Sequence, residues 1–211
     1  MNQRERMLSG LPYKAWLDGI EEDRQACKQK IYDFNQLPPS RQSKEAPQMI
    51  KNIFGKTGEN VWVEAPFHCD YGWNIEVGEN FYSNYNLTIL DVGKVTCGKN
   101  VQIAPNVSIY TAGHPVHPDS RNSGYEYGIP VTVGDNVWIG GNTVILPGVT
   151  VGSNVVIGAG SVVSKDIPDN TIAAGNPCKV IREITDEDRI YYFKKQKFDD
   201  EAWEEVKNKN K

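Results

Sequence analysis

The histidines are the residues of this chain that could do proton chemistry near neutral pH. There are three, and two of them, His114 and His117, lie in one segment that reads YTAGHPVHPDSRNSGYEYGIP, residues 110–130. The ordinary pKa of histidine is about 6.5, so such a side chain can take a proton from an attacking hydroxyl and return it to a leaving group. Imidazoles also bind zinc, which is the alternative chemistry for the same residues.

The histidine spacing argues against the zinc alternative. A three-histidine site would need His68 as well, but His114 and His117 are three residues apart on a loop and each is followed by proline. The four cysteines are scattered, with no C-x-x-C pair, so we expect neither a metal cluster nor a disulfide framework. Reduced cysteines are typical of cytosolic proteins, and we expect a cytoplasmic location with no required metal.

Charge and hydropathy exclude two classes of partner. The net charge is −4, so no overall positive field attracts nucleic acid. The first residues, MNQRERMLSGLPYKAW, contain no apolar core of a signal peptide, and no apolar run is long enough to span a bilayer. We therefore expect neither nucleic acid nor membrane as a partner.

A six-residue repeat surrounds the histidine segment. From Val133 the chain reads VGDNVW, IGGNTV, ILPGVT, VGSNVV, IGAGSV, VSKDIP, and looser copies begin at Val77, Ser83, Cys97 and Ile103. Two slips of two residues interrupt the earlier copies, near Trp73 and near Val95. Period six is neither the period two of a strand nor the 3.6 of a helix.

The repeat predicts a triangular coil with three short strands per turn, in which each coil is stable only when stacked on its neighbours. Aliphatic residues point inward, and Gly and Asn suit corners that need left-handed dihedrals. The fold class we expect is an all-β solenoid, a parallel β-helix of hexapeptide repeats over residues 61–184. The segment 110–130 protrudes from it, and such long excursions are usually functional or disordered.

Both ends differ from the repeat. Residues 1–60 predict an N-terminal helical arm, in which a first helix ends at Pro38-Pro39 and APQMIKNIFGKTG forms a second. Residues 185–211 predict a C-terminal helical tail, with Thr185 and Asp188 as its cap. We expect the aromatic residues of this tail to pack over the open end of the coil.

The sixth position of each hexad points out of the coil and is often apolar. Eighteen residues make one coil, so Trp138 should stack on Val156 and Val144 on Val162. Exposed apolar faces usually mark an interface, and we predict self-association with cyclic symmetry. The alternative is that the helical arms cover these faces within one chain.

Together, the repeats, the loop TAGHPVHPDSRNSGYEYG, the run VWIGGNTVILPGVTVG, the segment GNPCKVIREI and the arm motif YDFNQLPPS resemble the maltose/galactoside O-acetyltransferase family of hexapeptide-repeat acyltransferases. The resemblance covers nearly the whole chain. It implies a left-handed β-helix, a homotrimer with active sites between subunits, and transfer of acetyl from acetyl-CoA to a hydroxyl, typically of a sugar.

The resemblance also implies roles for single residues. His114 would be the general base, and the backbone N–H of Gly141 would donate to the tetrahedral oxyanion. No cysteine matches a nucleophile position, so we expect direct attack in a ternary complex. The predicted cofactor-binding residues are Asn84, Trp138, Gly141, Ala159, Ser164, Lys165, Lys179 and Arg182.

Asp70, Asn84 and Glu126 are the predicted acceptor-binding residues, although Asp70 and Asn84 could equally be coil corners. Ala15 stands where the family often has an aspartate, and Val92 follows Asp91 where a second acidic residue is expected. These departures leave the acceptor open: a non-sugar hydroxyl such as an antibiotic or serine is one alternative. A zinc-dependent lyase of carbonic-anhydrase type and a non-enzymatic solenoid binding module are the others.

Overall fold

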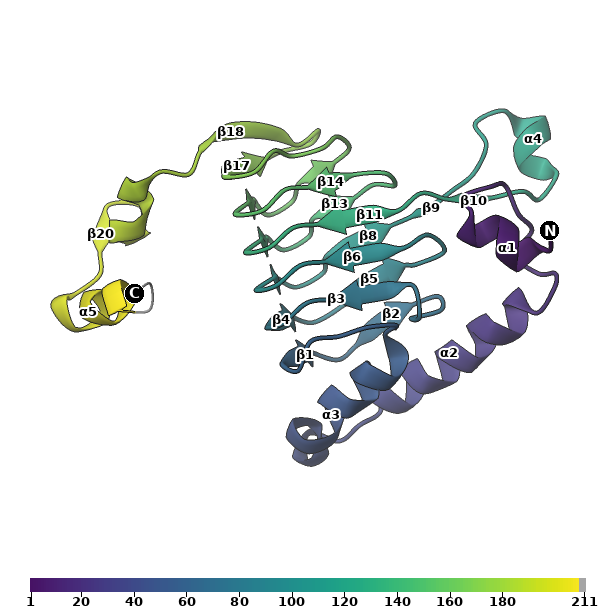
Figure 1. Cartoon of the computed structure of the whole chain (residues 1–211), viewed down its shortest axis with the longest axis horizontal. Helices are drawn as coiled ribbons and strands as arrows, with labels where there is room; N and C mark the ends of the chain where they lie inside the picture. Colours follow the sequence, from purple (N-terminus) through teal and green to yellow (C-terminus); the bar gives the residue numbers. More distant parts are fainter. Residues whose placement is uncertain (209–211) are drawn as a thin grey trace.

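The chain begins with three helices and continues as a stack of short parallel strands (Figure 1). The computed structural model describes residues 1–208, so the last three residues of the predicted tail lie outside the described residues. The helices are α1 (Gln3–Leu8), α2 (Ile20–Asn35) and α3 (Pro39–Ile53). Helix α2 buries Ile20, Cys27, Ile31 and Phe34.

Helix α3 starts at Pro39, several residues before the segment APQMIKNIFGKTG in which we expected it. Proline is well suited to the first position of a helix because its missing N–H would have no intrahelical partner there. The proline pair therefore begins the second helix as well as ending the first. None of the helices in residues 1–208 is long and apolar enough to cross a bilayer.

Three parallel sheets form the faces of the coil, which confirms the parallel β-helix. The first face consists of β1 (Val61–Val63), β4 (Phe81–Ser83), β7 (Gln102–Ile103), β12 (Trp138–Ile139), β15 (Val156–Ile157) and β17 (Thr171–Ala174). The second consists of β2 (Phe67–Cys69), β5 (Leu87–Leu90), β8 (Ser108–Tyr110), β13 (Val144–Ile145) and β16 (Val162–Val163). The third consists of β3 (Ile75–Val77), β6 (Val95–Cys97), β11 (Val131–Val133) and β14 (Thr150–Val151).

The corners of the coil depend on asparagine, as the repeat predicts. Eight asparagines have positive φ near 60°: Asn80, Asn86, Asn100, Asn106, Asn136, Asn142, Asn154 and Asn170. At the corner between the third and first faces, five of them stack, and each side-chain amide donates to the next at 2.8–2.9 Å. This ladder fixes the register between successive coils at the corner opposite the second face.

The corner between the second and third faces carries all the longer connections. Residues 70–74 and 91–94 lengthen the first two coils there, which accounts for the predicted slips near Trp73 and Val95. The 110–130 excursion leaves from the same corner. It contains an antiparallel pair, β9 (Ala112–Gly113) and β10 (Tyr127–Gly128), with the short helix α4 (Pro118–Asn122) between them. We call this corner the loop corner.

The inner side chains form one continuous apolar core. The first and fifth positions of the hexads are buried along the stack, from Val133 and Val137 to Val163 and Ile167. The core continues through β1 into the arm, where Ile50 and Phe34 pack against the first coil. Helices α2 and α3 thus close one end of the coil.

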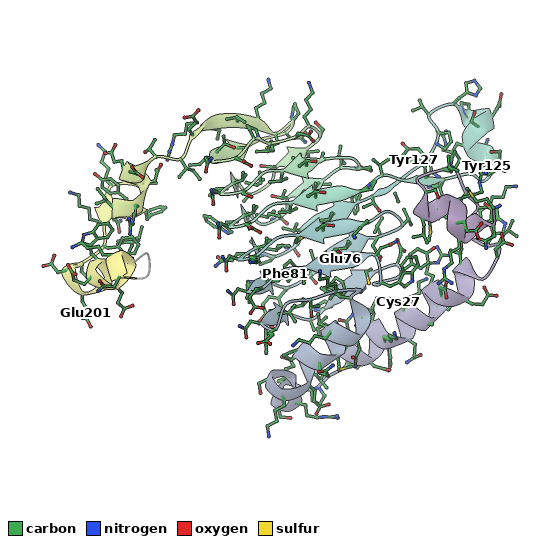
Figure 2. All side chains as sticks on the ribbon, viewed as in Figure 1. Cys27, Glu76, Phe81, Tyr125, Tyr127 and Glu201 are labelled. Atoms are coloured by element: carbon green, nitrogen blue, oxygen red, sulfur yellow. The ribbon has the colours of Figure 1, made fainter. Side chains whose placement is uncertain are left out.

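A second apolar cluster fastens the arm to the loop corner of its own chain. Met7, Tyr13, Ala15 and Ile20 of the arm pack against Tyr71 and Val92 of the coil. The backbone of Tyr13 also bridges that of Glu126, with N–H to O distances of 2.9 and 3.0 Å. Figure 2 shows Tyr125 and Tyr127 beside α1, and Cys27 between α2 and the coil.

The outward residues differ between faces. Trp138 pairs with Val156 and Val144 with Val162, as predicted from the repeat length. The indole of Trp138 is 55% exposed on the first face, where Gln102 lies between it and the exposed Tyr82. The third face instead presents threonines such as Thr132 and Thr150, together with Glu76. The arm lies at the loop corner and leaves Trp138 uncovered, so the alternative that the arm covers this face is wrong.

The tail does not cover the end of the coil, so that expectation is wrong. Strand β18 (Lys179–Glu183) pairs antiparallel with β17 and leads the chain away from the coil (Figure 1). Beyond it lie the 3-10 helix η1 (Asp186–Ile190), the hairpin of β19 (Tyr191–Phe193) and β20 (Gln196–Lys197), and α5 (Asp200–Asn208). The tail aromatics pack on one another instead: the Phe198 ring lies 5.7 Å from Tyr192 and 6.5 Å from Trp203.

Candidate active site

His114 follows β9 at the base of the excursion, and its side chain is 57% exposed. Its Nε2 atom lies 3.9 Å from Oε2 of Glu126, which precedes β10 on the paired strand. The antiparallel pairing of β9 and β10 brings these two residues together. The imidazole is therefore free to meet a substrate on one side while a carboxylate faces it on the other.

The other two histidines have different surroundings. His117 caps α4, where its Nδ1 accepts the backbone N–H of Asp119 at 3.2 Å. His68 points outward from β2 on the second face. The three histidines therefore lie in three different places: after β9, at the start of α4 and on β2. Within residues 1–208, no group of three or more His, Cys, Asp or Glu side chains is arranged to hold a metal ion.

Glu126 connects the histidine to the arm. Its Oε1 accepts a hydrogen bond from the hydroxyl of Tyr13 at 2.5 Å, while Oε2 faces His114. Burial raises the pKa of Tyr13 well above its usual value, and the neighbouring Glu126 adds to this, so the tyrosine is a neutral donor to the carboxylate. Sequence motifs do not point to Tyr13, because it lies 113 positions from Glu126 along the chain.

Asp70 lies at the same corner, one residue after β2. Burial raises the pKa of its carboxyl group, and the Arg24 guanidinium on α2 acts in the opposite direction. Glu126 is close enough to raise it further. Sequence patterns do not point to Arg24 either. It follows Ile20 by one helical turn, beside the buried residues of α2, and charged residues in such positions are usually solvated. Asp70 is therefore within electrostatic range of Glu126 and of Arg24, whose own ion pair is with Glu21.

The predicted coenzyme residues Asn84, Gly141 and Ala159 lie at another corner, between the first and second faces. Gly141 accepts from the N–H of Gly160 at 2.8 Å, but its own N–H has no acceptor among residues 1–208. The side-chain oxygen of Asn84 accepts the N–H of Tyr85 at 2.7 Å, so Asn84 also helps to form the turn at this corner. The exposed Trp138 lies on the first face, three residues before Gly141.

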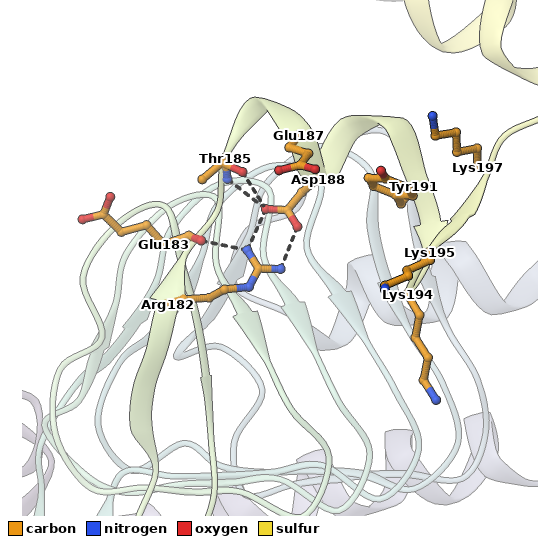
Figure 3. Close-up of a pocket in the computed structure, with 9 residues that line it drawn as sticks. All are labelled: Arg182, Glu183, Thr185, Glu187, Asp188, Tyr191, Lys194, Lys195 and Lys197. Carbon is orange, nitrogen blue, oxygen red and sulfur yellow. Dashed lines mark hydrogen bonds and ion pairs between the residues drawn. The ribbon is translucent and has the colours of Figure 1, made fainter.

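The remaining predicted coenzyme residues divide between the loop corner and strand β18. Ser164 and Lys165 follow β16 at the loop corner and are exposed, and Lys179 and Arg182 lie on β18. Arg182 is held by a two-pronged ion pair, Nη1 and Nη2 to the Asp188 carboxylate at 2.7 and 2.6 Å (Figure 3). Arg182 thereby holds the pKa of Asp188 well below its usual range. The two residues line an open hollow of about 910 Å³, whose other cations are Lys194, Lys195 and Lys197.

Within one chain, the predicted site residues form two groups that do not meet. His114, Asp70 and Glu126 belong to the loop corner, with Lys165 above them. Asn84 and Gly141 belong to the corner at the other edge of the second face. An entire face of the coil therefore lies between the expected base and the expected oxyanion donor.

Comparison with known proteins gives these features a context. Residues 6–58 match the maltose acetyltransferase hexapeptide capping motif, and residues 130–165 match the bacterial transferase hexapeptide model of six repeats. The chain is 51% identical over 197 residues to galactoside O-acetyltransferase of Escherichia coli, covering 93% of this chain and 97% of that protein.

Two solved structures are similar over most of the chain. A galactoside acetyltransferase in complex with coenzyme A has a TM-score of 0.91 and 50% identity, covering 94% of this chain and 99% of that one. A maltose O-acetyltransferase from Clostridium difficile 630 has a TM-score of 0.86 and 51% identity, covering 88% and 99%.

The coil, its repeats and the helical arm define a hexapeptide-repeat acyltransferase. Identity of 51% across nearly the full length of both chains is specific enough to go further. The chain belongs to the maltose/galactoside O-acetyltransferase family, whose enzymes use acetyl-CoA as the acetyl donor.

Proposed function

We propose that this protein transfers acetyl from acetyl-CoA to a hydroxyl of a sugar, by direct attack in a ternary complex with His114 as general base. The observation that carries the proposal is the exposed His114 imidazole, held on the protruding hairpin 3.9 Å from the Glu126 carboxylate. A hydroxyl is a weak nucleophile near neutral pH, and removal of its proton during attack typically accelerates such steps 100- to 10,000-fold.

Glu126 supports the base without being one itself. The Glu126 carboxylate lies 3.9 Å from the ring, so it can stabilise the positive charge that forms on the imidazole during attack. Tyr13 fixes the carboxylate by donating to its other oxygen. His114 then returns the proton to the coenzyme A thiolate as the tetrahedral intermediate collapses. The C–O bond to the acceptor forms and the C–S bond of the thioester breaks, with no acetylated enzyme in between.

The corner between the first and second faces would hold the donor substrate. The unpaired N–H of Gly141 is suited to the oxyanion that forms on the thioester carbonyl. The pantetheine arm would lie against Ala159, one coil beyond Gly141, and against the flat, exposed ring of Trp138. Asn84 lies two coils before Gly141 at the same corner. Ser164, Lys165, Lys179 and Arg182 would serve the pantetheine end and the phosphates, which need cations.

A site built from these two groups needs two copies of the chain. The loop corner of one copy would supply His114, and the opposite edge of the second face on a neighbour would supply Gly141 and Asn84. The exposed, apolar first face around Trp138 favours such packing, whereas the third face is polar. A closed cyclic arrangement, the homotrimer, repeats the contact three times without leaving an open end.

The acceptor pocket favours a sugar over an apolar acceptor such as an antibiotic. Asp70 and Glu126 offer two partly buried carboxylates within electrostatic range of each other and of the Arg24–Glu21 ion pair, and such polar groups match the many hydroxyls of a sugar. The similar proteins named for galactoside and maltose point to the same class. Because all four cysteines are free thiols, we propose that the protein works in the reducing cytoplasm.

The proposal is tested by comparing His114→Ala with His117→Ala, an exposed histidine three residues away in the same excursion. We expect His114→Ala to lower kcat by about 100-fold or more, because the general base is lost, while coenzyme A binding stays nearly unchanged. His117→Ala should stay within about threefold of wild type. Rates would be measured by thiol release with glucosides, galactosides, maltose and chloramphenicol as acceptors. Wild-type activity in His114→Ala would remove His114 from the mechanism, and a preference for chloramphenicol would overturn the sugar assignment.

A further inference from the structure

The loop corner contains a buried carboxylate that the proposed mechanism does not use. Asp91 follows β5 and is 0% exposed. Burial raises the pKa of its carboxyl group to about 6, and the two N–H groups that it accepts act in the opposite direction. The Asp70 carboxylate also raises this pKa. A buried charge without a cation is costly, so its retention calls for a physical reason.

Asp91 organises the connection one coil below it. Its Oδ1 atom accepts the backbone N–H of Asp70 at 2.9 Å and that of Tyr71 at 3.0 Å. Its own carbonyl oxygen accepts the Asn74 amide at 2.7 Å, at the other end of the same connection. One residue therefore determines the path of the backbone through residues 70–74, where the extra residues of the first coil are accommodated.

The part of this connection nearest to Asp91 carries the predicted acceptor residue. Asp70 is one of the two residues whose N–H groups Asp91 accepts, and its carboxylate is within electrostatic range of Arg24 on α2 and of Glu126 beside the hairpin. The adjacent Tyr71 is buried against the arm, beside Val92. A shift of this backbone would move the Asp70 carboxylate relative to both partners, while the corner that holds Gly141 would be unaffected.

We propose that Asp91 is a positioning residue that holds the Asp70 carboxylate in the acceptor pocket by accepting the Asp70 and Tyr71 N–H groups. This inference rests on the proposed function, because it takes Asp70 to bind the acceptor. It also gives a role to Asp91, the acidic residue of LTILD, which directly precedes Val92, the position where a second acidic residue was expected. Asp91 acts through the backbone and not on the sugar itself, since its side chain is fully enclosed.

The test is a double-mutant cycle with Asp91→Ala, Asp70→Ala and the double variant, in the full-length protein. Steady-state rates are measured with the best sugar acceptor varied at saturating acetyl-CoA, and with acetyl-CoA varied at saturating acceptor. We expect Asp91→Ala to raise the acceptor KM by about tenfold and to leave the acetyl-CoA KM within about twofold. Because Asp91 acts through Asp70, adding Asp91→Ala to Asp70→Ala should change the acceptor KM by less than about twofold.

Two further variants separate positioning from stability. Asp91→Asn keeps an oxygen that can accept both N–H groups, and we expect it to restore the acceptor KM to within about threefold of wild type. Asp135→Ala removes a carboxylate that accepts the Lys99 N–H at 2.7 Å on a remote corner, and it should leave both KM values unchanged. If Asp91→Ala does not fold, Asp91→Ser replaces it, because the shorter side chain cannot reach both N–H groups.

The outcomes distinguish this inference from the function on which it rests. A rise in the acceptor KM that disappears in the Asp70→Ala background supports the positioning role. An unchanged acceptor KM in folded Asp91→Ala, equal losses for both substrates, or full additivity with Asp70→Ala would overturn it while leaving the sugar acetyltransferase intact. Absence of sugar acetylation by the wild-type protein would overturn the proposed function and this inference together.

Discussion

The surroundings of His114, the proposed base, depend on residues outside its own loop. Its carboxylate neighbour Glu126 is held by Tyr13, a residue that is fully buried in the arm. Side-chain chemistry at the proposed site therefore depends on residues from three segments. Motifs around the histidine reveal only one of these, because the contacts of Tyr13 and Arg24 join residues far apart in sequence.

Asp91 gives a residue-scale prediction for the dependence of stability on pH. The folded state raises the pKa of Asp91 from 3.8 to about 6, so between these values the folded state binds more protons than the unfolded state. Stability from this group is therefore lowest above pH 6 and increases as the pH falls toward 4. In Asp91→Asn this contribution is absent.

Urea unfolding at matched protein concentration checks this. The unfolding free energy of wild type relative to Asp91→Asn should increase by about 2 kcal/mol between pH 7.5 and pH 4.5. A difference that does not change with pH, or that changes in the opposite direction, would show that Asp91 has an ordinary pKa in the folded protein.

At the scale of elements, the hexads predicted the coil well because their period is imposed by geometry. Inward positions such as Val133 and Ile139, and corner residues such as Asn136, repeat every six residues, so even the pairing of Trp138 with Val156 could be predicted. The tail was predicted less well. Thr185 and Asp188 do form the expected cap, but the helix there is a single 3-10 segment followed by a hairpin. The tail has no sequence repeat, so its sequence does not predict where it lies relative to the coil.

The site could be predicted only in part for the same reason. Sequence spacing places Asp70, His114 and Glu126 on turns, and the fold brings them to one corner. It does not bring Asn84, Gly141 and Ala159 to that corner, because these belong to turns that leave a different face. The repeat predicts which residues stack on one another along one corner of the coil. How close the residues of two different corners come to each other depends on how copies of the coil pack together.

The junction of arm and hairpin gives an element-scale prediction. Tyr13→Phe removes the donor to Glu126 but retains the buried ring, so we expect a loss of about 1.5–3 kcal/mol, typical of a hydrogen bond to a charged group. Hydrogen exchange in residues 10–20 should accelerate as the arm loosens. Tyr125→Phe is the matched control, since its ring lies over Lys14 and its hydroxyl has no hydrogen-bond partner in the part of the chain that the structure describes. Equal stability of both variants would show that the Tyr13 contact does not hold the arm.

Strand β18 gives a second prediction at this scale. Lys179→Ala should raise the KM for acetyl-CoA several-fold, by about the effect of one phosphate contact, with little change in the acceptor KM. Lys99→Ala, an exposed lysine on the corner between the third and first faces, serves as the control. If Lys179→Ala affects both substrates equally, its proposed phosphate role is wrong.

The coil is one continuous stack at the centre of the molecule, and this decides what one copy can do alone. Its core is continuous from the arm to β17, so the corners cannot approach one another without unfolding. The proposed base and the proposed oxyanion donor lie on different corners, separated by the second face. Acetyl transfer by this chain would therefore depend on assembly, and conditions that separate the copies should abolish activity before they unfold the coil.

Complementation between two inactive variants shows whether one active site draws its residues from two copies of the chain. His114→Ala lacks the base at the loop corner, and Asn84→Ala lacks a group at the opposite edge of the second face, so each should lose most activity when expressed alone. When the two are co-expressed and assemble randomly, some sites combine an intact His114 from one copy with an intact Asn84 from its neighbour. We expect activity to recover at roughly a quarter of the sites in a cyclic assembly, because each of the two required groups is intact in half of the copies. No recovery in mixed assemblies that form normally would contradict it, because both groups would then have to come from the same chain.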